Sequence, residues 1–406
     1  MSQQTSTTAK ERFPFPLLCL TLGAFAIGMT EFIIMGLLPN VAHDLHVSIP
    51  KAGFLITGYA LGVAVGAPLL TVLTLRVPQK KLLVLLMIIF IAGNALSIVA
   101  PSFALLLAAR VLTAFAHGTF LGVGSLIASR LVRPEKQAGA VSLVLAGLSI
   151  ANIVGVPFGT MIGQQLGWRA SFAVIVGLGI ISLAGIIRFI PQIRQDEVPR
   201  LDRELKSLMN PRVLLMLGIG MFGCACLFSL FTYITPILES ISGFAEHQVT
   251  YILVLFGFGI TIGNLVGGRL ADWKLMPSVT TGYVVLAILL VVLAIAFHHP
   301  IAAVVTVFLW GVAAFGVMPG VNFRIMDLAR EAPLLAATST HSVLNIGNAG
   351  GAYLGGLAIT HLGLGQVPWV AVCLAAAGLI GCLISIAADR KANAARSAAS
   401  ATAIEA

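Results

Sequence analysis

Four ionisable side chains lie inside long apolar stretches of the sequence: Glu31, Arg110, His117 and, nearer the end of its stretch, His341. A charge at the centre of a membrane costs about 2.5–3.5 kcal/mol on insertion scales, so such residues usually face a cavity or a partner. Glu31 is the carboxylate among them, and a buried carboxyl can exchange a proton as its surroundings change. These residues mark where proton chemistry is expected.

Glu31 and Arg110 are placed to lie at the same depth. Each is about eight residues from one end of its apolar stretch, or roughly 12 Å at ~1.5 Å per helical residue. Burial favours a neutral carboxyl and a neighbouring guanidinium favours a carboxylate, so the two residues together can control a proton. A permanent pair that only fixes helix packing is the alternative. His117, seven residues after Arg110, shares its face and is a packing, cavity or proton-relay candidate.

Composition identifies the elements that must position these residues. Of 406 residues, 58% are hydrophobic and 10% are charged, against about 25% charged in soluble domains. The mean hydropathy is +1.01. A soluble chain of this kind would expose large apolar patches, so an integral membrane protein is indicated. The net charge of +9 is spread over short loops, which disfavours nucleic acid as a partner.

We expect twelve membrane-spanning helices, because about 20 apolar residues cross a bilayer and lipid cannot satisfy open strand edges. The expected spans are 13–39, 51–75, 82–100, 102–129, 138–163, 170–190, 212–239, 248–270, 278–298, 300–323, 334–361 and 367–388.

The basic residues predict the orientation. With a cytoplasmic N-terminus, 21 of the 24 lysines and arginines fall on the cytoplasmic side, while Lys51 and Arg169 fall outside and Arg110 lies within a span. Cytoplasmic loops of membrane proteins carry this excess of positive charge. We therefore expect both termini in the cytoplasm and an even number of spans.

The chain contains an internal repeat. At an offset of 197 residues, Pro39, Gly62 and Gly66 coincide with Pro236, Gly259 and Gly263; at 196, Asn152, Gly155 and Gly159 coincide with Asn348, Gly351 and Gly355. Such repeats are common in transporters. We expect a first bundle of six helices over 1–190, a cytoplasmic linker over 191–211, and a second bundle over 212–406 with a short cytoplasmic tail.

Glycines spaced by four recur in every third span, which places a groove of small residues on one helix face. We expect these grooves to mark close helix crossings between the two halves, although ordinary helix packing is an alternative. The glycines are Gly58, Gly62, Gly66; Gly155, Gly159, Gly163; Gly259, Gly263, Gly267; and Gly347, Gly351, Gly355.

Three motifs resemble the major facilitator superfamily, and more narrowly its drug:proton antiporter and arabinose-efflux-permease-like branch. They are GMTEFIIMGLLPNVAHDL (28–45), GVPFGT (155–160) with GWRASF (167–172), and the loop motif GRLAD (268–272). The resemblance implies two pseudo-symmetric six-helix bundles, alternating access and export of small molecules such as sugars, drugs or nucleoside-like compounds. It covers essentially the whole chain.

The resemblance also implies residues for conformational switching: Arg76, Lys80, Gly155, Pro157, Gly159, Gly268 and Asp272. The sequence departs from the family pattern in three places. Leu75 stands where the first loop motif has Asp, Val156 separates Gly155 from Pro157, and Ala114 replaces a usual Gly after Arg110.

Polar and aromatic residues of the spans are candidates for lining a substrate cavity, with packing or interhelical hydrogen bonds as the alternative for each: Tyr59, Asn152, Tyr233, Trp310, Asn345 and Asn348. No phosphate-binding loop is present, and Gly218, Gly220 and Gly223 lie inside a span rather than after a strand, so nucleotide binding is not expected. The five cysteines lie in apolar stretches and predict neither disulfide nor metal.

The sequence thus predicts a monomeric secondary transporter of the bacterial inner membrane, driven by protons and without a cofactor or enzymatic activity. An importer or uniporter on the same fold, and a membrane sensor that does not transport, are the alternatives.

Overall fold

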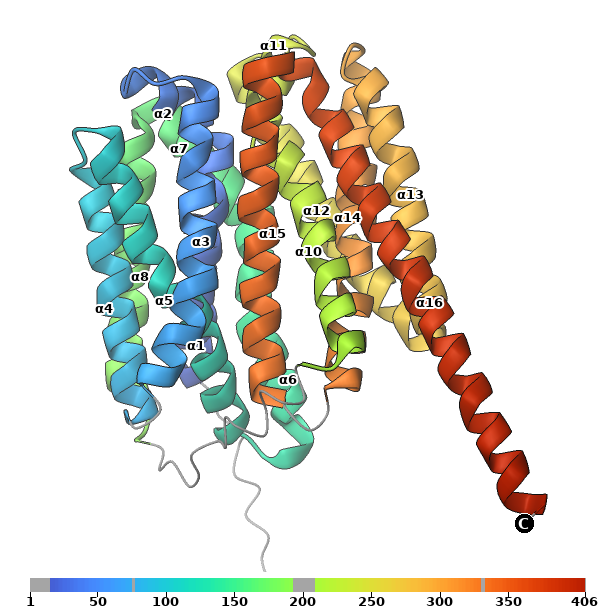
Figure 1. Cartoon of the computed structure of the whole chain (residues 1–406). Coiled ribbons are helices and arrows are strands. Elements are labelled where there is room, and N and C mark those ends of the chain that lie inside the picture. Colours follow the sequence, from blue (N-terminus) through green and yellow to red (C-terminus); the bar gives the residue numbers. More distant parts are fainter. Residues whose placement is uncertain (1–14, 75–76, 193–208, 330–332, 406) are drawn as a thin grey trace, which may run out of the picture.

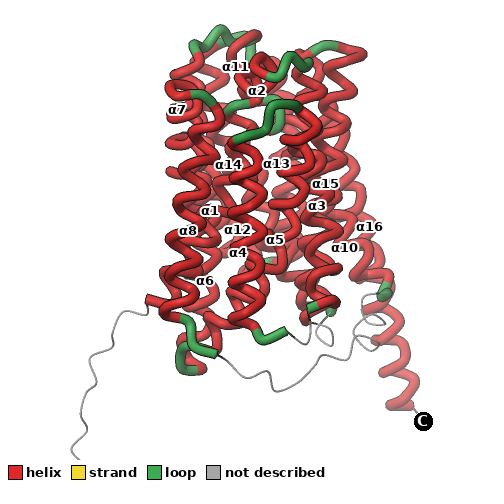
Figure 2. The backbone as a smooth tube through the Cα atoms, turned by 90° about the vertical axis from the view of Figure 1, so that its left-hand side faces the viewer, coloured by secondary structure: helices red, strands yellow, loops and turns green. Residues whose placement is uncertain are grey.

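A computed structural model describes residues 15–74, 77–192, 209–329 and 333–405, and these ranges form a bundle of long helices joined by short connections (Figures 1 and 2). The helices run nearly parallel to one another. Arg76 and most of the expected linker, residues 193–208, lie outside the described ranges. The long helices follow the order of the twelve expected spans.

The helices of the first half begin with a long helix followed by a short one, and a π-helical turn, η2, interrupts the fifth span. They are α1 (Phe15–Gly36), α2 (Leu38–Asp44), α3 (Ile49–Leu73), α4 (Gln79–Ile98), α5 (Phe103–Arg130), η1 (Pro134–Lys136), α6 (Gln137–Ile150), η2 (Ala151–Gly155), α7 (Val156–Leu166) and α8 (Trp168–Phe189).

The second half repeats the pattern of a long helix followed by a short one. Its helices are α10 (Pro211–Phe231), α11 (Ile234–Ser240), α12 (Glu246–Trp273), α13 (Leu275–Ala296), α14 (Pro300–Leu328), α15 (Pro333–Leu362), η3 (Leu364–Gln366) and α16 (Val367–Glu405). The last helix continues well beyond residue 388, where the sequence predicted its span to end, and leaves the bundle (Figure 1).

Local sequence explains several helix boundaries. The side chains of Ser48 and Ser102 accept hydrogen bonds from the main-chain N–H groups of Lys51 and Leu105, and so cap α3 and α5. Pro157 has no N–H and lies in the first turn of α7, directly after η2. A missing helical donor explains why the regular α-helix gives way to a π-helical turn there.

Eleven helices within the described residues are long and apolar enough to cross a membrane. The twelfth, α15, has comparable length but carries a polar face, and Figure 1 shows it between α3 and α10, with which it packs. Large apolar side chains point outward, among them Ile181, Ile288 and Ile295, each about 60% exposed. Such a surface is compatible with lipid rather than water.

The glycine grooves pack within each half, so the expectation that they lie between the halves is wrong. A Cβ on Gly62 would meet Ala114 of α5, and one on Gly159 would meet Met29 and Ile33 of α1. In the second half, a Cβ on Gly263 would meet the main chain of α14 and one on Gly351 that of α10. The grooves make close helix pairs inside each bundle.

Candidate functional site

Arg110 reaches from α5 to the turn of α1 that carries Glu31. Its guanidinium donates a hydrogen bond of 2.5 Å to the main-chain oxygen of Thr30 and a longer one, 3.4 Å, to that of Glu31. The guanidinium carbon also lies 4.3 Å from the centre of the Tyr59 ring, within cation–π range. Arg110 is 1% exposed, so α1, α3 and α5 enclose its charge.

His117 is the residue that approaches the carboxylate itself. Its Nε2 lies 3.9 Å from Oε2 of Glu31, and its Nδ1 lies 3.2 Å from the Tyr59 hydroxyl. When the hydroxyl donates to Nδ1, the ring hydrogen is on Nε2 and faces Glu31. Tyr59, His117 and Glu31 thus form a chain of groups that can exchange protons.

Two polar residues that the sequence reasoning missed support this cluster. Thr30, directly before Glu31, donates its hydroxyl hydrogen to the Asn94 side-chain oxygen, and the Asn94 amide donates to the main-chain oxygen of Phe90. Both are fully buried. Asn94, a polar residue of the α4 span at the depth of Glu31, was the signal in the sequence that could have indicated this contact.

The cluster borders an aromatic contact between the two halves. Phe32 lies 6.0 Å from Phe228 and 6.1 Å from Phe231 of α10, measured between ring centres. Phe231 stacks on Phe256 at 4.6 Å, and Phe256 lies 4.8 Å from Trp310. Trp310 is fully buried, and its Nε1 has no hydrogen-bond partner among the described residues.

Four of the other cavity candidates make hydrogen bonds to residues outside the Glu31 cluster. Asn152 donates to Leu148, Asn345 to His341, and Asn348 to the side chain of Asn345. Tyr233, at the break between α10 and α11, donates to the main-chain oxygen of Ala352 on α15. The structure therefore gathers Tyr59 with the charged residues and leaves the other five on other elements, with Asn345 and Asn348 sharing α15.

The residues expected to switch conformation are dispersed. Lys80 donates to the main-chain oxygen of Ile187 on α8. Asp272 is exposed and forms no ion pair with a described residue, and a Cβ on Gly268 would meet open space. Gly155 and Gly159 pack against side chains of α1.

Hydrogen bonds join the two halves at the end of the bundle where α2 and α11 lie, which we call the α11 end (Figure 1). Asn40 donates to the Glu246 carboxylate at 2.7 Å, and Gln164 donates to the Glu246 main-chain oxygen at 3.1 Å. Thr250 donates to the Gln164 side-chain oxygen at 3.1 Å. We call Asn40, Gln164, Glu246 and Thr250 the polar seal.

A proline provides one further bond between the halves. Pro39 has no N–H, so the main-chain oxygen of Met35, four residues earlier, lacks its helical donor. The Thr235 hydroxyl of α11 donates to that oxygen at 2.8 Å. The repeat of Pro39 and Pro236 in the sequence gave no sign of this contact, since it joins one half to the other.

Two of the resembling motifs meet beside the seal. Asp44, at the end of α2, accepts hydrogen bonds from Trp168 Nε1 and from the Arg169 guanidinium. The bond from Arg169, followed by that from Trp168, lowers the pKa of Asp44 below its ordinary value. Gly167 has φ +87°, a conformation that glycine adopts without strain, and it turns the chain from α7 into α8.

The sequence profile of the Major Facilitator Superfamily matches residues 20–342. The chain belongs to this transporter superfamily. Among its relatives, the Escherichia coli K12 inner membrane transport protein YdhP is 42% identical over 90% of this chain and 94% of its own length. The putative transporter AraJ of the same strain is 34% identical, covering 86% and 88%. A Streptomyces lividans chloramphenicol resistance protein is 32% identical, covering 90% and 95%.

The fold agrees with a solved superfamily structure. The human organic anion transporter MFSD10 (TETRAN) superposes with a TM-score of 0.68 at 15% identity, covering 91% of this chain and 99% of that one. At this identity the match supports the fold. The predicted superfamily and its twelve-helix architecture are confirmed, and the chain is an integral membrane protein.

Proposed function

We propose that the protein is a secondary active transporter of the inner membrane, which exports small organic molecules in exchange for protons. The observation that carries this proposal is the buried Glu31 carboxyl beside His117, one residue from the Phe32 contact between the halves. A carboxyl at that place can change charge in step with a movement of the halves. The names of the chloramphenicol resistance relative and of the transport relatives support export of small molecules.

Arg110 controls the Glu31 turn in this mechanism. Its Nε is buried without a partner among the described residues, so the guanidinium retains a donor for the Glu31 carboxylate or for a polar substrate group. Proton release leaves a carboxylate that needs such a donor, and proton binding removes the need. Each charge moved through 100 mV supplies about 2.3 kcal/mol, so the proton gradient can drive the export.

The polar seal and the aromatic contact hold the halves together at the α11 end. With both termini in the cytoplasm, as the basic residues predict, this end faces the periplasm. The structure then corresponds to a state closed toward the periplasm. Transport requires the seal to open and the opposite end to close, with Asp272 and the GRLAD loop acting as the latch there.

The experiment is flux in proteoliposomes with an imposed pH gradient, using labelled chloramphenicol, a pentose and a nucleoside as probes. For whichever probe the wild type accumulates, Glu31→Gln should abolish accumulation and retain passive exchange, because glutamine keeps the shape but cannot exchange a proton. Glu135→Gln, on an exposed loop, is the matched control and should transport normally.

Three results would contradict the proposal. Undiminished proton-driven flux in Glu31→Gln would make Glu31 a packing residue. Accumulation of a probe in the same direction as the protons would indicate an importer. Saturable binding without flux of any probe would favour a sensor.

A further inference from the structure

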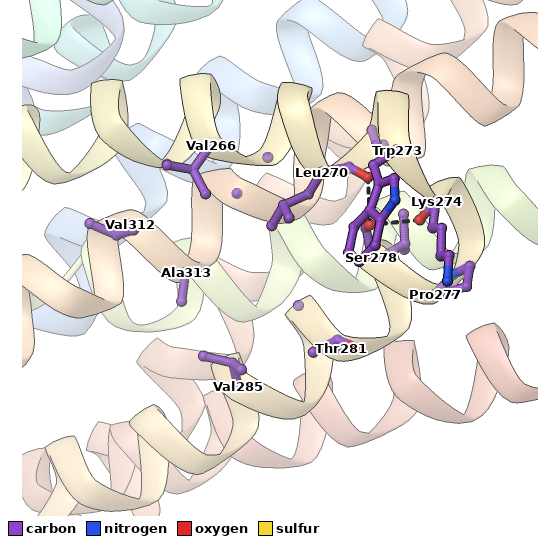
Figure 3. Close-up of a pocket in the computed structure, with 17 residues that line it drawn as sticks. Val266, Leu270, Trp273, Lys274, Pro277, Ser278, Thr281, Val285, Val312 and Ala313 are labelled. Atoms are coloured by element: carbon purple, nitrogen blue, oxygen red, sulfur yellow. Dashed lines mark hydrogen bonds between the residues drawn. The ribbon is translucent and has the colours of Figure 1, made fainter.

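A groove runs along the outer surface of the second half, between α12, α13 and α14 (Figure 3). Its volume of about 320 Å³ falls in the range of ~300–1,000 Å³ that small-molecule sites occupy. Val266 and Leu270 of α12 line one side, and Thr281 and Val285 of α13 line the other. The groove lies apart from the Glu31 cluster.

Close packing of α12 on α14 produces the groove. A Cβ on Gly263 would meet the main-chain oxygen of Val312, and one on Gly267 that of Gly316. The two backbones therefore touch, and no side chain stands between them. Ala313 and Gly316 of α14 and Gly282 of α13 are also small, so few side-chain atoms fill the space beside this contact.

The groove opens toward the surroundings of the protein and not toward its interior. Val266, Leu270 and Val285 are each exposed by about 44%, although they line an almost wholly apolar surface. In a membrane-spanning bundle, outward apolar surface at this depth is solvated by lipid. The body of the occupant is accordingly an acyl chain.

At the α12–α13 connection, which we call the mouth of the groove, the side chains indicate the headgroup of that occupant. Lys274 connects α12 to α13, is exposed, and places its Nζ 4.9 Å from the centre of the Trp273 ring. Paired tryptophan and lysine side chains are typical of the membrane–water interface. Within the described part of the chain, no acidic residue lines the groove, and the nearby Asp272 is not among its lining residues.

Lys274 is also the cationic side-chain donor at the mouth. The Ser278 hydroxyl points to the main-chain oxygens of Leu270 and Lys274, as the dashed lines in Figure 3 show. α13 begins at Leu275, so the positive end of its dipole adds to the ammonium charge. A phosphate at this position would therefore meet positive potential above an apolar slot.

We propose that the groove binds one anionic phospholipid of the bilayer, with an acyl chain along α12 and α14 and its phosphate at Lys274. The site is independent of proton coupling at Glu31. The bound lipid would occupy a fixed position on the second half, beside the α12–α13 connection that follows the GRLAD motif. An ion pair between the headgroup and Lys274 would also hold the α12–α13 connection in place.

The test uses delipidated full-length protein titrated with phosphatidylglycerol or phosphatidylcholine of identical acyl chains, with bound lipid counted by native mass spectrometry. Wild type should retain one phosphatidylglycerol more tightly than phosphatidylcholine. Lys274→Ala should weaken phosphatidylglycerol binding about five-fold, the effect expected for one interfacial lysine, and leave phosphatidylcholine binding unchanged. Lys81→Ala, an exposed lysine at the start of α4, is the control.

A second pair of variants tests the apolar slot. Thr281→Trp should fill the groove and abolish retention of both lipids, whereas Val284→Trp, exposed on α13 but outside the groove, should retain them. Both positions are exposed, so neither variant must disturb the core. Lipid retention unchanged by Thr281→Trp, or a phosphatidylglycerol preference that survives Lys274→Ala, would overturn the proposal. Loss of transported-probe binding in Thr281→Trp, with lipid retained, would instead make the groove a substrate entrance.

Discussion

At the scale of the residue, Arg110 reaches Glu31 through the main chain and not through the carboxylate. From the sequence, equal depth in two spans predicted that the two residues can meet if their helices are neighbours, and the structure brings α1 and α5 together. Equal depth could not distinguish a bond to the Glu31 carboxylate from bonds to the main-chain oxygens of Thr30 and Glu31. That choice depends on the rotation of α1 and on the approach of Tyr59 and His117, which spacing along one helix does not encode.

Asp44 provides a pH prediction at this scale. Its pKa is lowered in the folded protein by the bonds from Arg169 and Trp168. Because the folded value lies below the unfolded one, which is about 3.9, the stabilisation is present above the unfolded pKa. It is lost as the pH falls through the folded pKa.

Asp44→Asn should therefore lower the free energy of unfolding by a constant amount between pH 5 and 8, on the order of 1 kcal/mol or less for an exposed pair. The thermal unfolding midpoint in detergent measures this change. The difference from wild type should shrink in stronger acid. Asp272→Asn removes an exposed carboxylate without an ion pair to a described residue and should show no such pattern. A deficit in Asp44→Asn that persisted unchanged below the pKa of Asp44 would show that shape, rather than charge, matters there.

At the scale of the element, spacing by four correctly predicted which glycines share a helix face. It did not predict the helix they face. Gly351 packs on α10 and Gly263 on α14, so both close helix pairs within the second half. Small residues are equally suited to contacts within and between bundles, so the pattern alone cannot separate the two.

Adjacent glycines of α15 offer a matched test. A Cβ on Gly351 would meet the main-chain oxygen of Ala225, whereas one on Gly350 would meet open space. We expect Gly351→Ala to separate α15 from α10 and lower the unfolding midpoint by several degrees, corresponding to about 1–3 kcal/mol. Gly350→Ala should be neutral or slightly stabilising, since alanine favours helix. Equal stability of the two variants would show that α10 and α15 can move apart without cost.

At the scale of the whole molecule, we expect the seal at the α11 end to determine which state is populated. Gln164→Ala removes the bonds to Glu246 and Thr250. At about 1 kcal/mol for a neutral hydrogen bond, it should shift the population of the closed state roughly five-fold or more. Electron–electron distances between spin labels on the ends of α7 and α12 would measure that shift.

The neighbouring variant His247→Ala is the control, because His247 is exposed and its side chain takes no part in the seal. A label-to-label distance distribution unaffected by Gln164→Ala would mean that the remaining contacts, namely the Asn40 and Thr235 bonds and the aromatic contact, suffice to hold the halves together. The number and order of the spans were predictable from apolar length. The seal was not, because Asn40, Gln164 and Glu246 are surface residues far apart in the chain, with no periodicity to connect them.

The polar face of α15 has a consequence for how the protein is made. Its Asn345, Asn348 and Ser342 would be poorly tolerated by a translocon that releases helices singly into lipid, where each polar residue adds to the insertion cost. The helices that cover α15, namely α3 and α10, are both synthesised before it. When α15 is inserted, α3 and α10 are therefore already in the membrane. The least apolar span can then pack its polar face against them rather than against lipid.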